Sequence, residues 1–393
     1  MPDYRYLVVG GGMTADAACK GIRSIDPDGS IGLVGDEPDP PYARPPLTKG
    51  LWLGKEESSI WRGTADEGVD LRLGRTVVGL DLGERTATDD RGDTYGYERL
   101  LLATGGRPRQ MPGAADGVIS FRTLADYRAV RAAATEGARV VVVGGGFIGS
   151  EIAAALATNG CAVTMVFPEK AIGARLFPQD LALSVTNAYR DRGVEVATGA
   201  RVASVERVGS DFRVTTEAGD AFEGAAVVAG LGIVPRDELA AAAGLPTDDG
   251  IPVDDRGRVD GRDDVFAAGD VARFPARDLG RDLRIEHEDH AKSHGRQVGR
   301  NMAGADEPYD HLPFFYSDLF DLGYEAVGDL DARLDTVAEW PELHRKGVVC
   351  YRDDDGRPRG FLLWDVWGKV DAARELIRAG SPVGATQLEE LIA

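Results

Sequence analysis

The stretch VVVGGGFIGSEIAAAL, residues 141–156, consists of an apolar strand, a turn of glycines and the apolar start of a helix. An earlier stretch, YLVVGGGMTADAAC at residues 6–19, has the same construction. In both places we expect a second strand after the helix, at 31–34 in the first copy and at 162–167 in the second. Strand–helix–strand units that open with a glycine turn are typical of folds that bind dinucleotides.

The similarity of the two halves continues beyond these units. Residues 75–106 and 201–232 both show alternating strands, a turn with acidic residues and glycine, and a final apolar strand. Three matched features in the same order indicate an internal duplication of a nucleotide-binding fold. We therefore predict an α/β protein with two Rossmann-like dinucleotide-binding domains, connected by a helix at 118–136.

A different pattern begins at Phe314, where strands rich in aromatic residues include a hairpin at 348–364 with an Asp-Gly turn. Helices are expected at 370–379, ended by Gly380, and from about Thr386. This region predicts a smaller α+β domain. The expected domains are a first domain in two parts at 1–117 and 250–310, a second domain at 118–249 and a C-terminal domain at 311–393.

The composition is that of an ordinary globular chain, with 393 residues of which 43% are hydrophobic. The 45 basic and 65 acidic residues give a net charge of −20, which argues against binding to nucleic acid or to an anionic membrane surface. No apolar run reaches the roughly 18 residues of a membrane span, and no leader is expected, so we predict a cytoplasmic protein. Cys19, Cys161 and Cys350 are far apart, which favours buried thiols over disulfides or a metal site.

The two glycine turns are candidate pyrophosphate sites. A pyrophosphate must approach backbone N–H groups at a helix start, where free donors and the helix dipole favour negative charge. Side chains would block this approach, and a small last residue lets the helix pack closely on the strand. One such motif also arises from tight packing alone, but two in register are much stronger evidence. The residues concerned are Gly10, Gly12 and Ala15 in the first turn, and Gly144, Gly146 and Gly149 in the second.

Acidic residues after the second strands mark the expected ribose sites. Asp36 follows the first turn at the distance where a carboxylate binds adenosine ribose hydroxyls. In the second copy the strand ends at Phe167, and the nearest acid, Glu169, comes two residues later. Glu169 would repel a 2′-phosphate and favours NADH. Lys170 and Arg175 could receive that phosphate, so NADPH is the second choice.

Further segments resemble the two-dinucleotide flavoprotein reductases, in the branch with ferredoxin and rubredoxin reductases, monodehydroascorbate reductase and apoptosis-inducing factor. The resemblance covers essentially the whole chain and implies a first domain that holds FAD and a second that holds NAD(P)H. Beyond the glycine turns it rests on DEPDPPYARPPLTKGLW (36–52), LLATGGRPR (101–109), FPEK (167–170), VFAAGDVARF (265–274), EHEDHAKSHGRQVGRNM (286–302) and YEAVGD (324–329).

The same resemblance assigns further contacts to the cofactors. Gly269 and Asp270 would bring the chain back to FAD, with Asp270 at the ribityl or phosphate region. A simple helix cap is the alternative interpretation of that aspartate. Arg44 falls where the family contacts FAD. The other matched positions are Ala103, Thr104, Gly105, Arg109, Phe147, Ile148 and Gly232.

Lys49 and Glu151 match a lysine–glutamate pair that the family places at the flavin. Burial gives a physical reason for the pairing, because either charge alone would be costly to desolvate, while together they can hold the ring edge near N5. The alternative for Glu151 is an acid that stabilises its helix N-terminus. Tyr316 lies where relatives often carry a tryptophan over the dinucleotide, and plain domain-interface core is the alternative there.

A helix expected to begin near Asp289 would direct its N-terminus at the flavin. By resemblance, Glu286 and His287 would face the flavin and nicotinamide rings. The spacing of His287, His290 and His294 also fits a metal-binding helix face, but an FAD site explains this segment and we expect no metal. His290 and His294 are expected to be partly exposed.

The resemblance implies hydride transfer from NADH to FAD and then release of electrons to a one-electron carrier such as a ferredoxin. Residues 37–160 contain no cysteine, which disfavours chemistry with a redox thiol at the flavin. An NADH-sensing flavoprotein of the apoptosis-inducing-factor kind and a reductase of quinones or monodehydroascorbate stay open, as does a homodimer. Candidates for a basic patch that would dock an acidic carrier, with a solvated loop as the alternative, are Arg273, Arg277, Arg281 and Arg284.

Overall fold

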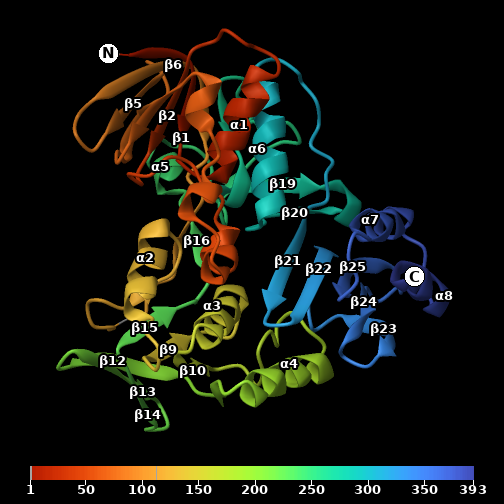
Figure 1. The fold of residues 1–393 in the computed structure, drawn as a ribbon. Helices are drawn as coiled ribbons and strands as arrows, with labels where there is room; N and C mark the ends of the chain where they lie inside the picture. The colour runs from red at the N-terminus through yellow and green to blue at the C-terminus, as the bar shows by residue number, and fades with distance from the viewer. Residues whose placement is uncertain (1, 112) are drawn as a thin grey trace. The chain divides into compact units, whose positions relative to one another are not determined.

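The computed structural model describes residues 2–111 and 113–393 and divides into two compact units (Figure 1). The chain passes from one unit to the other at both ends of the segment 45–55, within two short strands, β7 (Gly106–Pro108) and β16 (Ile233–Pro235), and between Pro313 and Phe314. Unit 1 consists of the residues up to Arg44, Glu56–Arg107 and Val234–Pro313. Unit 2 consists of Pro45–Lys55, Pro108–Ile233 and Phe314–Ala393.

Unit 1 is built on a mainly parallel sheet with the strand order β3-β2-β1-β6-β5-β4, in which β18 also pairs with β6. Strand β5 is antiparallel to both of its neighbours, β4 and β6, and all other neighbouring pairs of this sheet are parallel. Strand β2 is buried throughout and β1 over its last four residues, as is usual for parallel strands that are covered on both faces of the sheet. The bounds are β1 (Asp3–Val9), β2 (Ile31–Gly35), β3 (Val69–Leu73), β4 (Val77–Asp81), β5 (Thr86–Asp89), β6 (Thr94–Leu102) and β18 (Val265–Ala267).

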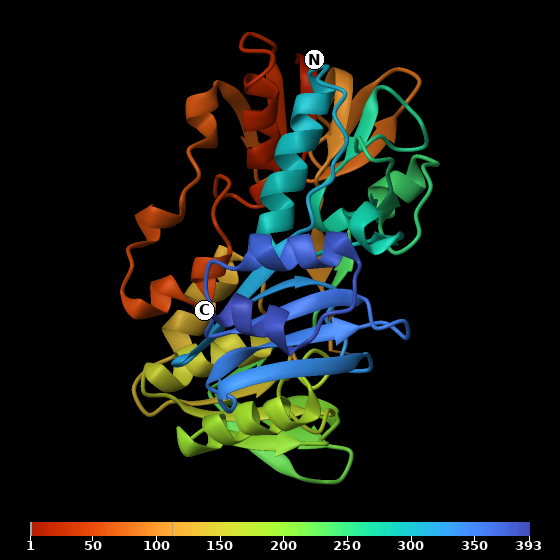
Figure 2. The same ribbon diagram turned by 90° about the vertical axis from the view of Figure 1, so that its right-hand side faces the viewer.

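Two helices of unit 1, α1 (Met13–Arg23) and α6 (Glu288–Met302), lie side by side and share a core with the sheet (Figures 1 and 2). Glycines on α6 allow this approach, because a methyl group at Gly295 or Gly299 would collide with a carbonyl oxygen of α1. The remaining elements are α5 (Glu238–Ala242), β17 (Ile251–Pro252), β19 (Ala272–Ala276), β20 (Arg281–Leu283), and the 3-10 helices η3 (Glu57–Ile60), η4 (Thr64–Glu67), η5 (Gly269–Val271) and η6 (Arg277–Leu279).

Unit 2 repeats the strand–helix–strand construction in a parallel sheet with the order β11-β10-β9-β15-β8, accompanied by an antiparallel sheet β12-β13-β14. The strands are β8 (Ile119–Ser120), β9 (Arg139–Val143), β10 (Ala162–Phe167), β11 (Glu195–Thr198), β12 (Val202–Val208), β13 (Asp211–Thr216), β14 (Ala221–Gly224) and β15 (Ala226–Ala229). The helices are α2 (Leu124–Ala133), α3 (Phe147–Thr158), α4 (Gln179–Asp191), and the 3-10 helices η1 (Pro45–Leu47) and η2 (Gly50–Leu53).

The C-terminal part of unit 2 is an antiparallel sheet with the order β21-β22-β25-β24-β23, drawn in blue in Figure 2. Helix α7 packs on β22 and β25, and α8 packs on β23 and β24. The bounds are β21 (Phe314–Leu319), β22 (Leu322–Gly328), β23 (Asp335–Glu342), β24 (Lys346–Arg352), β25 (Pro358–Trp364), α7 (Val370–Ala379) and α8 (Ala385–Ile392).

The predicted α/β architecture with a smaller α+β region is confirmed. The connecting helix expected at 118–136 is shorter, because β8 occupies its start and a capping box at Thr123 begins α2 one residue later. All three cysteines are buried, as expected. Within residues 2–111 and 113–393, no helix is long and apolar enough to cross a membrane.

Candidate functional site

The first glycine turn forms the N-terminus of α1 in unit 1. Gly10 has a φ of +128°, and a methyl group there would collide with the carbonyl oxygen of Ala103. Gly12 is the N-cap of α1, without a side-chain cap, and a methyl group there would meet no protein atom within 4 Å. Gly10 is therefore required by packing, whereas Gly12 leaves the helix N–H groups open to an anion. We call this open helix terminus the first cradle.

The second glycine turn has the same geometry at the N-terminus of α3 in unit 2. Gly144 has a φ of +120°, and a methyl group there would collide with the carbonyl oxygen of Gly230. Gly146 is the N-cap, again without a side-chain cap, and is open in the same sense as Gly12. Gly149 must lack a side chain because a methyl group would collide with the carbonyl oxygen of Gly144. We call this terminus the second cradle, and both cradles fit a pyrophosphate.

Asp36, the expected ribose ligand of unit 1, forms an ion pair of 2.5 Å with Arg236. The carbonyl oxygen of Arg236 accepts a hydrogen bond of 2.6 Å from the Thr104 hydroxyl. The backbone N–H of Arg236 donates a hydrogen bond of 2.9 Å to the carbonyl oxygen of Gly105. Sequence reasoning missed Arg236. A signal was present, because Pro-Arg recurs at 108–109 and 235–236, and the N–H of Arg109 likewise donates to Gly232.

Arg44 lies in a tight polar group of unit 1. Its guanidinium pairs with Glu37 at 2.6 Å, donates to the Tyr42 hydroxyl at 3.1 Å and stacks on the Tyr42 ring. Burial opposes its charge, but Tyr42, Glu37 and Asp270 outweigh this effect and raise the pKa of Arg44. Arg44 is thus a fixed cation, as a residue that contacts FAD would need to be.

Gly269 and Asp270 begin the 3-10 helix η5, beside α1 and α6. Gly269 has a φ of +74°, and any side chain there would collide with the hydroxyl of Thr14 on α1. Its N–H donates to Nδ1 of His294 at 3.3 Å. Asp270 is 9% exposed, and its charge acts on both Arg44 and His287: it adds to the raised pKa of Arg44 and opposes the stronger lowering of the His287 pKa by burial. The two predicted FAD residues Arg44 and Asp270 are therefore brought together within unit 1.

At the end of β10 in unit 2, Glu169 pairs with Arg175 at 2.6 Å. The side chain of Arg175 is 87% exposed, while that of Glu169 is 25% exposed. Lys170 is exposed as well. The carboxylate that favours NADH and the guanidinium that could receive a 2′-phosphate therefore neutralise each other in this structure.

Lys49 and Glu151 form an ion pair of 2.5 Å inside unit 2, with side chains 14% and 7% exposed. Lys49 precedes η2, and Glu151 lies in the second turn of α3. The carboxylate also accepts hydrogen bonds from the hydroxyls of Thr48 at 2.5 Å and Ser317 at 2.6 Å. The structure thus brings together the two predicted residues and adds two that sequence reasoning missed. Both hydroxyl donors directly adjoin residues that were singled out, Lys49 and Tyr316.

Tyr316 on β21 lies with its ring 5.4 Å from the Lys49 ammonium, in cation–π contact. Its neighbour Phe315 packs edge-to-face on Phe147, with ring centroids 5.2 Å apart. Phe147 and Ile148, the first residues of α3, are 38% and 36% exposed. Apolar side chains exposed beside an open helix terminus are suited to cover a bound ligand.

The first turn of α6 in unit 1 carries two acidic residues, Glu288 and Asp289. Glu288 pairs with Lys292 at 3.2 Å, and Asp289 with His311 at 2.6 Å. These acids offset part of the positive helix end. Burial, opposed by nearby Asp270, lowers the pKa of His287, the N-cap, to about 4, so its ring is neutral at neutral pH. Glu286 pairs with Arg284 at 2.7 Å.

His290 and His294 are completely buried, so the expectation of partial exposure was wrong. They face inward because α6 packs against β19 and the segment after the helix, where Phe274 and Tyr309 contact both rings. Burial lowers the pKa of His290 to about 3 and that of His294 well below its usual value. No group that could hold a metal ion is found in the described part of the chain.

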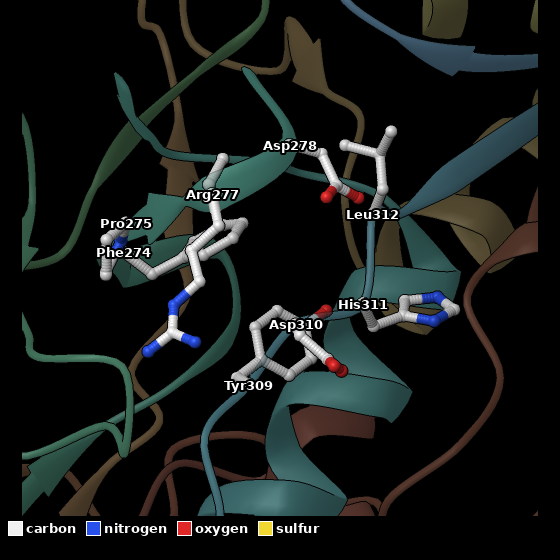
Figure 3. A pocket seen from close by; sticks show the side chains of 9 residues that line it. Phe274, Pro275, Arg277, Asp278, Tyr309, Asp310, His311 and Leu312 are labelled. Carbon is white, nitrogen blue, oxygen red and sulfur yellow. The ribbon is translucent and has the colours of Figure 1, made fainter. Parts of the chain in front are cut away.

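A shallow hollow in unit 1 lies between β19, η6 and the segment 309–312. Figure 3 shows Arg277 reaching toward Tyr309, while the His311 side chain is directed away. Arg277 pairs with Asp255, Arg273 with Asp248, and Arg284 with Glu286. These three arginines of the proposed docking patch are therefore neutralised locally, which favours the alternative interpretation of a solvated loop. The hollow is lined by Phe274, Pro275, Ala276, Arg277, Asp278, Tyr309, Asp310, His311 and Leu312.

Comparison with known proteins agrees with this geometry. The family model of the pyridine nucleotide-disulphide oxidoreductases matches residues 4–295, and that of the C-terminal region of mitochondrion-associated apoptosis-inducing factor matches residues 298–344. Apoptosis-inducing factor 1 of Dictyostelium discoideum is 32% identical, over 95% of this chain and 78% of that protein. The ferredoxin--NAD(+) reductase component of the anthranilate 1,2-dioxygenase system of Burkholderia cepacia is 35% identical, over 98% and 97%.

Solved structures show the same relationship. A chain of the covalent putidaredoxin reductase–putidaredoxin complex matches with a TM-score of 0.90 and 27% identity, over 100% of this chain and 99% of that one. A ferredoxin reductase of the CYP199A2 system of Rhodopseudomonas palustris matches with a TM-score of 0.89, also at 27% identity. The chain therefore belongs to the pyridine nucleotide-disulphide oxidoreductase family and is an FAD-dependent NAD(P)H oxidoreductase.

Proposed function

We propose that this protein takes a hydride from NADH onto FAD and passes the electrons singly to a small iron–sulfur protein of the ferredoxin type. The observation that carries the proposal is the pair of open cradles, one in each unit, at Gly12 and Gly146. Two uncapped helix termini in matching folds are suited to two pyrophosphates. The relative from Burkholderia cepacia, named as a ferredoxin--NAD(+) reductase component, supports the choice of acceptor.

In unit 1, the first cradle would receive the FAD pyrophosphate and Asp36 the adenosine ribose. Arg44 and Asp270 would hold the middle of the cofactor, one as a cation and one as an acceptor. Bound FAD supplies a ring that takes up two electrons as a hydride and releases them one at a time. His287, neutral at neutral pH, would contribute shape and hydrogen bonding rather than charge beside Glu286.

In unit 2, the second cradle would receive the NADH pyrophosphate, with Phe147 and Ile148 covering the dinucleotide. Lys49 and Glu151 would meet the flavin edge, as the family resemblance implies. Their mutual pairing allows both charges to stay in a dry site without a large net desolvation cost. Tyr316, in place of the tryptophan of many relatives, would stack with a smaller ring.

Thiol chemistry does not enter this proposal. Cys19 is buried on α1, and burial raises the pKa of its thiol to about 12. Burial raises the pKa of Cys350 to about 12 as well. A redox cysteine must be accessible and have a lowered pKa to react as a thiolate. We infer that the chain uses the family fold for electron transfer to an external carrier.

A second candidate is an NADH-sensing flavoprotein, in which the reduced protein changes partner instead of passing electrons on. It is favoured by the match of residues 298–344 to the C-terminal region of apoptosis-inducing factor. Anaerobic reduction in a stopped-flow instrument, followed by mixing with ferredoxin, rubredoxin or quinone, separates the two. Fast reoxidation by ferredoxin supports the reductase, whereas slow reoxidation by every acceptor supports the sensor.

The cradles themselves are tested with a matched pair of variants. Gly12→Val should abolish FAD binding, because its side chain would occupy the space that the first pyrophosphate needs. Gly146→Val should leave FAD bound but weaken NADH binding at least tenfold, as measured by the NADH dependence of flavin bleaching. Loss of FAD from Gly146→Val with retention in Gly12→Val would reverse the assignment of the two cradles.

A further inference from the structure

Glu151 is held by three donors that come from two segments remote from it in the chain. The ammonium of Lys49 and the hydroxyl of Ser317 bond to Oε1, and the hydroxyl of Thr48 bonds to Oε2. The distances are 2.5, 2.6 and 2.5 Å, in the range of strong hydrogen bonds to a carboxylate. We call these three donors the carboxylate clamp. Both oxygens of the carboxylate are thus engaged, and all four residues belong to unit 2.

Burial strengthens the hydrogen bonds of the carboxylate clamp and makes their loss costly. Ser317 is completely buried and Thr48 is 6% exposed, so water does not replace either hydroxyl easily. In a low-dielectric environment, a hydrogen bond to a charged group is stronger and its loss is more costly than in water. A carboxylate that lost one donor would therefore rotate or shift toward the remaining ones, and the ammonium bonded to it would move too.

Tyr324 on β22 is the residue that pairs with Ser317 on β21 in the antiparallel sheet. Burial, and then the Glu151 charge, raise the pKa of Tyr324 well above its usual value, so its hydroxyl keeps its proton. Tyr324 stacks on Trp364 with ring centroids 5.4 Å apart and both rings are almost fully buried. Ser317 is thus paired with a residue whose ring is buried and stacked in the core of the C-terminal sheet.

The same strand also limits Lys49 from the other side. Tyr316, adjacent to Ser317, lies with its ring 5.4 Å from the ammonium. Strand β21 therefore supplies both a hydroxyl that anchors the carboxylate and an aromatic face that limits where the ammonium can go. Successive residues of a strand point to opposite faces, so Tyr316 and Ser317 of this edge strand can contact the ion pair from two sides.

We propose that Ser317 and Thr48 are positioning residues that set the place of the Lys49 ammonium and thereby tune the reduction potential of the bound flavin. The inference rests on the proposed function, in which the Lys49–Glu151 pair meets the flavin edge. A cation held close to the ring favours its reduced, more negative form. A cation released from its position would stabilise that form less.

The first experiment measures the equilibrium between NADH and the FAD-loaded protein. In Ser317→Ala and in Thr48→Val, we expect the equilibrium constant for flavin reduction to fall about tenfold, or about 30 mV for a two-electron couple. The conservative variants Ser317→Thr and Thr48→Ser should restore it. The matched control is Thr216→Val, which removes another buried hydroxyl of unit 2, bonded to the N–H of Asp220 on the β13–β14 hairpin, and should leave the constant unchanged.

The second experiment uses the flavin-free protein, so that it does not depend on the cofactor. Thermal unfolding is compared for Ser317→Ala, Glu151→Gln and the double variant. We expect the two effects to be strongly non-additive, because the hydroxyl stabilises the fold mainly through the carboxylate it donates to. Additive effects, or an unchanged equilibrium constant in both hydroxyl variants, would overturn the inference. Failure of the unaltered protein to bind FAD would instead overturn the proposed function.

Discussion

Acidification should destabilise unit 1 through two buried histidines, His290 and His294. Both rings are neutral in the fold, because burial lowers the pKa of His290 to about 3 and that of His294 well below its usual value. In the unfolded chain they titrate near a pKa of about 6.5. As the pH falls, these two histidines therefore bind protons in the unfolded state but not in the folded state. The unfolding free energy is therefore highest above about pH 6.5 and falls progressively as the pH drops from there toward the lowered pKa values of the folded state.

The size of the effect follows from these values. Between pH 7 and pH 5, each histidine that protonates only on unfolding lowers the unfolding free energy by about 2 kcal/mol, so the pair lowers it by about 4 kcal/mol. His287, whose pKa is lowered to about 4 mainly by burial, acts in the same direction. The other groups that face the pair are Phe274, Tyr309 and His311.

The assay is urea unfolding at pH 7, 6 and 5. Unfolding is monitored through the hydrogen exchange of peptides from α6, which report on unit 1 alone. His290→Gln and His294→Gln should each reduce the loss between pH 7 and pH 5 by about 2 kcal/mol, whatever their effect at pH 7. The control Met302→Ala removes buried packing from the same helix but no titratable group, and should lower stability equally at all three pH values. A glutamine variant with the same pH dependence as the unaltered protein would refute the reasoning.

Three further predictions concern charge and burial. Arg175→Ala frees Glu169 and should raise the preference for NADH over NADPH, measured as the ratio of kcat/KM values, several-fold. Glu169→Ala should lower this ratio. A change of the ratio in the same direction in both variants would contradict the pairing. The Cys19 thiol, with a pKa raised to about 12, should resist alkylation at pH 8 until the protein unfolds, as mass spectrometry can check. Asp16→Ala should cost about 2–3 kcal/mol in unfolding free energy, because it removes the buried acceptor of the buried Thr64 hydroxyl and of the partly exposed Arg62 and Lys20 side chains. Asp371→Ala, which breaks an exposed pair, should cost about 1 kcal/mol or less, and urea unfolding measures both.

The cradles could be read from the sequence because every requirement is local. A pyrophosphate site of this kind needs an apolar strand, glycines at fixed spacing and a helix start, and all of these lie within 16 residues of one another. Even so, the sequence did not separate the reasons for the glycines. Only the structure shows that Gly10 meets the carbonyl oxygen of Ala103, whereas Gly12 faces open space. Packing and ligand binding both require glycine, so the sequence alone does not show which of the two explains a given glycine.

The contacts between distant parts of the chain were decided by tertiary structure alone. Thr48 and Ser317 are 103 and 166 positions from the Glu151 carboxylate that they hold, and Arg236 is 200 positions from Asp36. The burial of His290 depends in the same way on what packs against α6. The sequence by itself determined the duplicated nucleotide fold and the residues of each cradle, because local periodicity and turn chemistry encode them. Which side chains meet a buried charge depends on how the elements pack, and no local pattern records that.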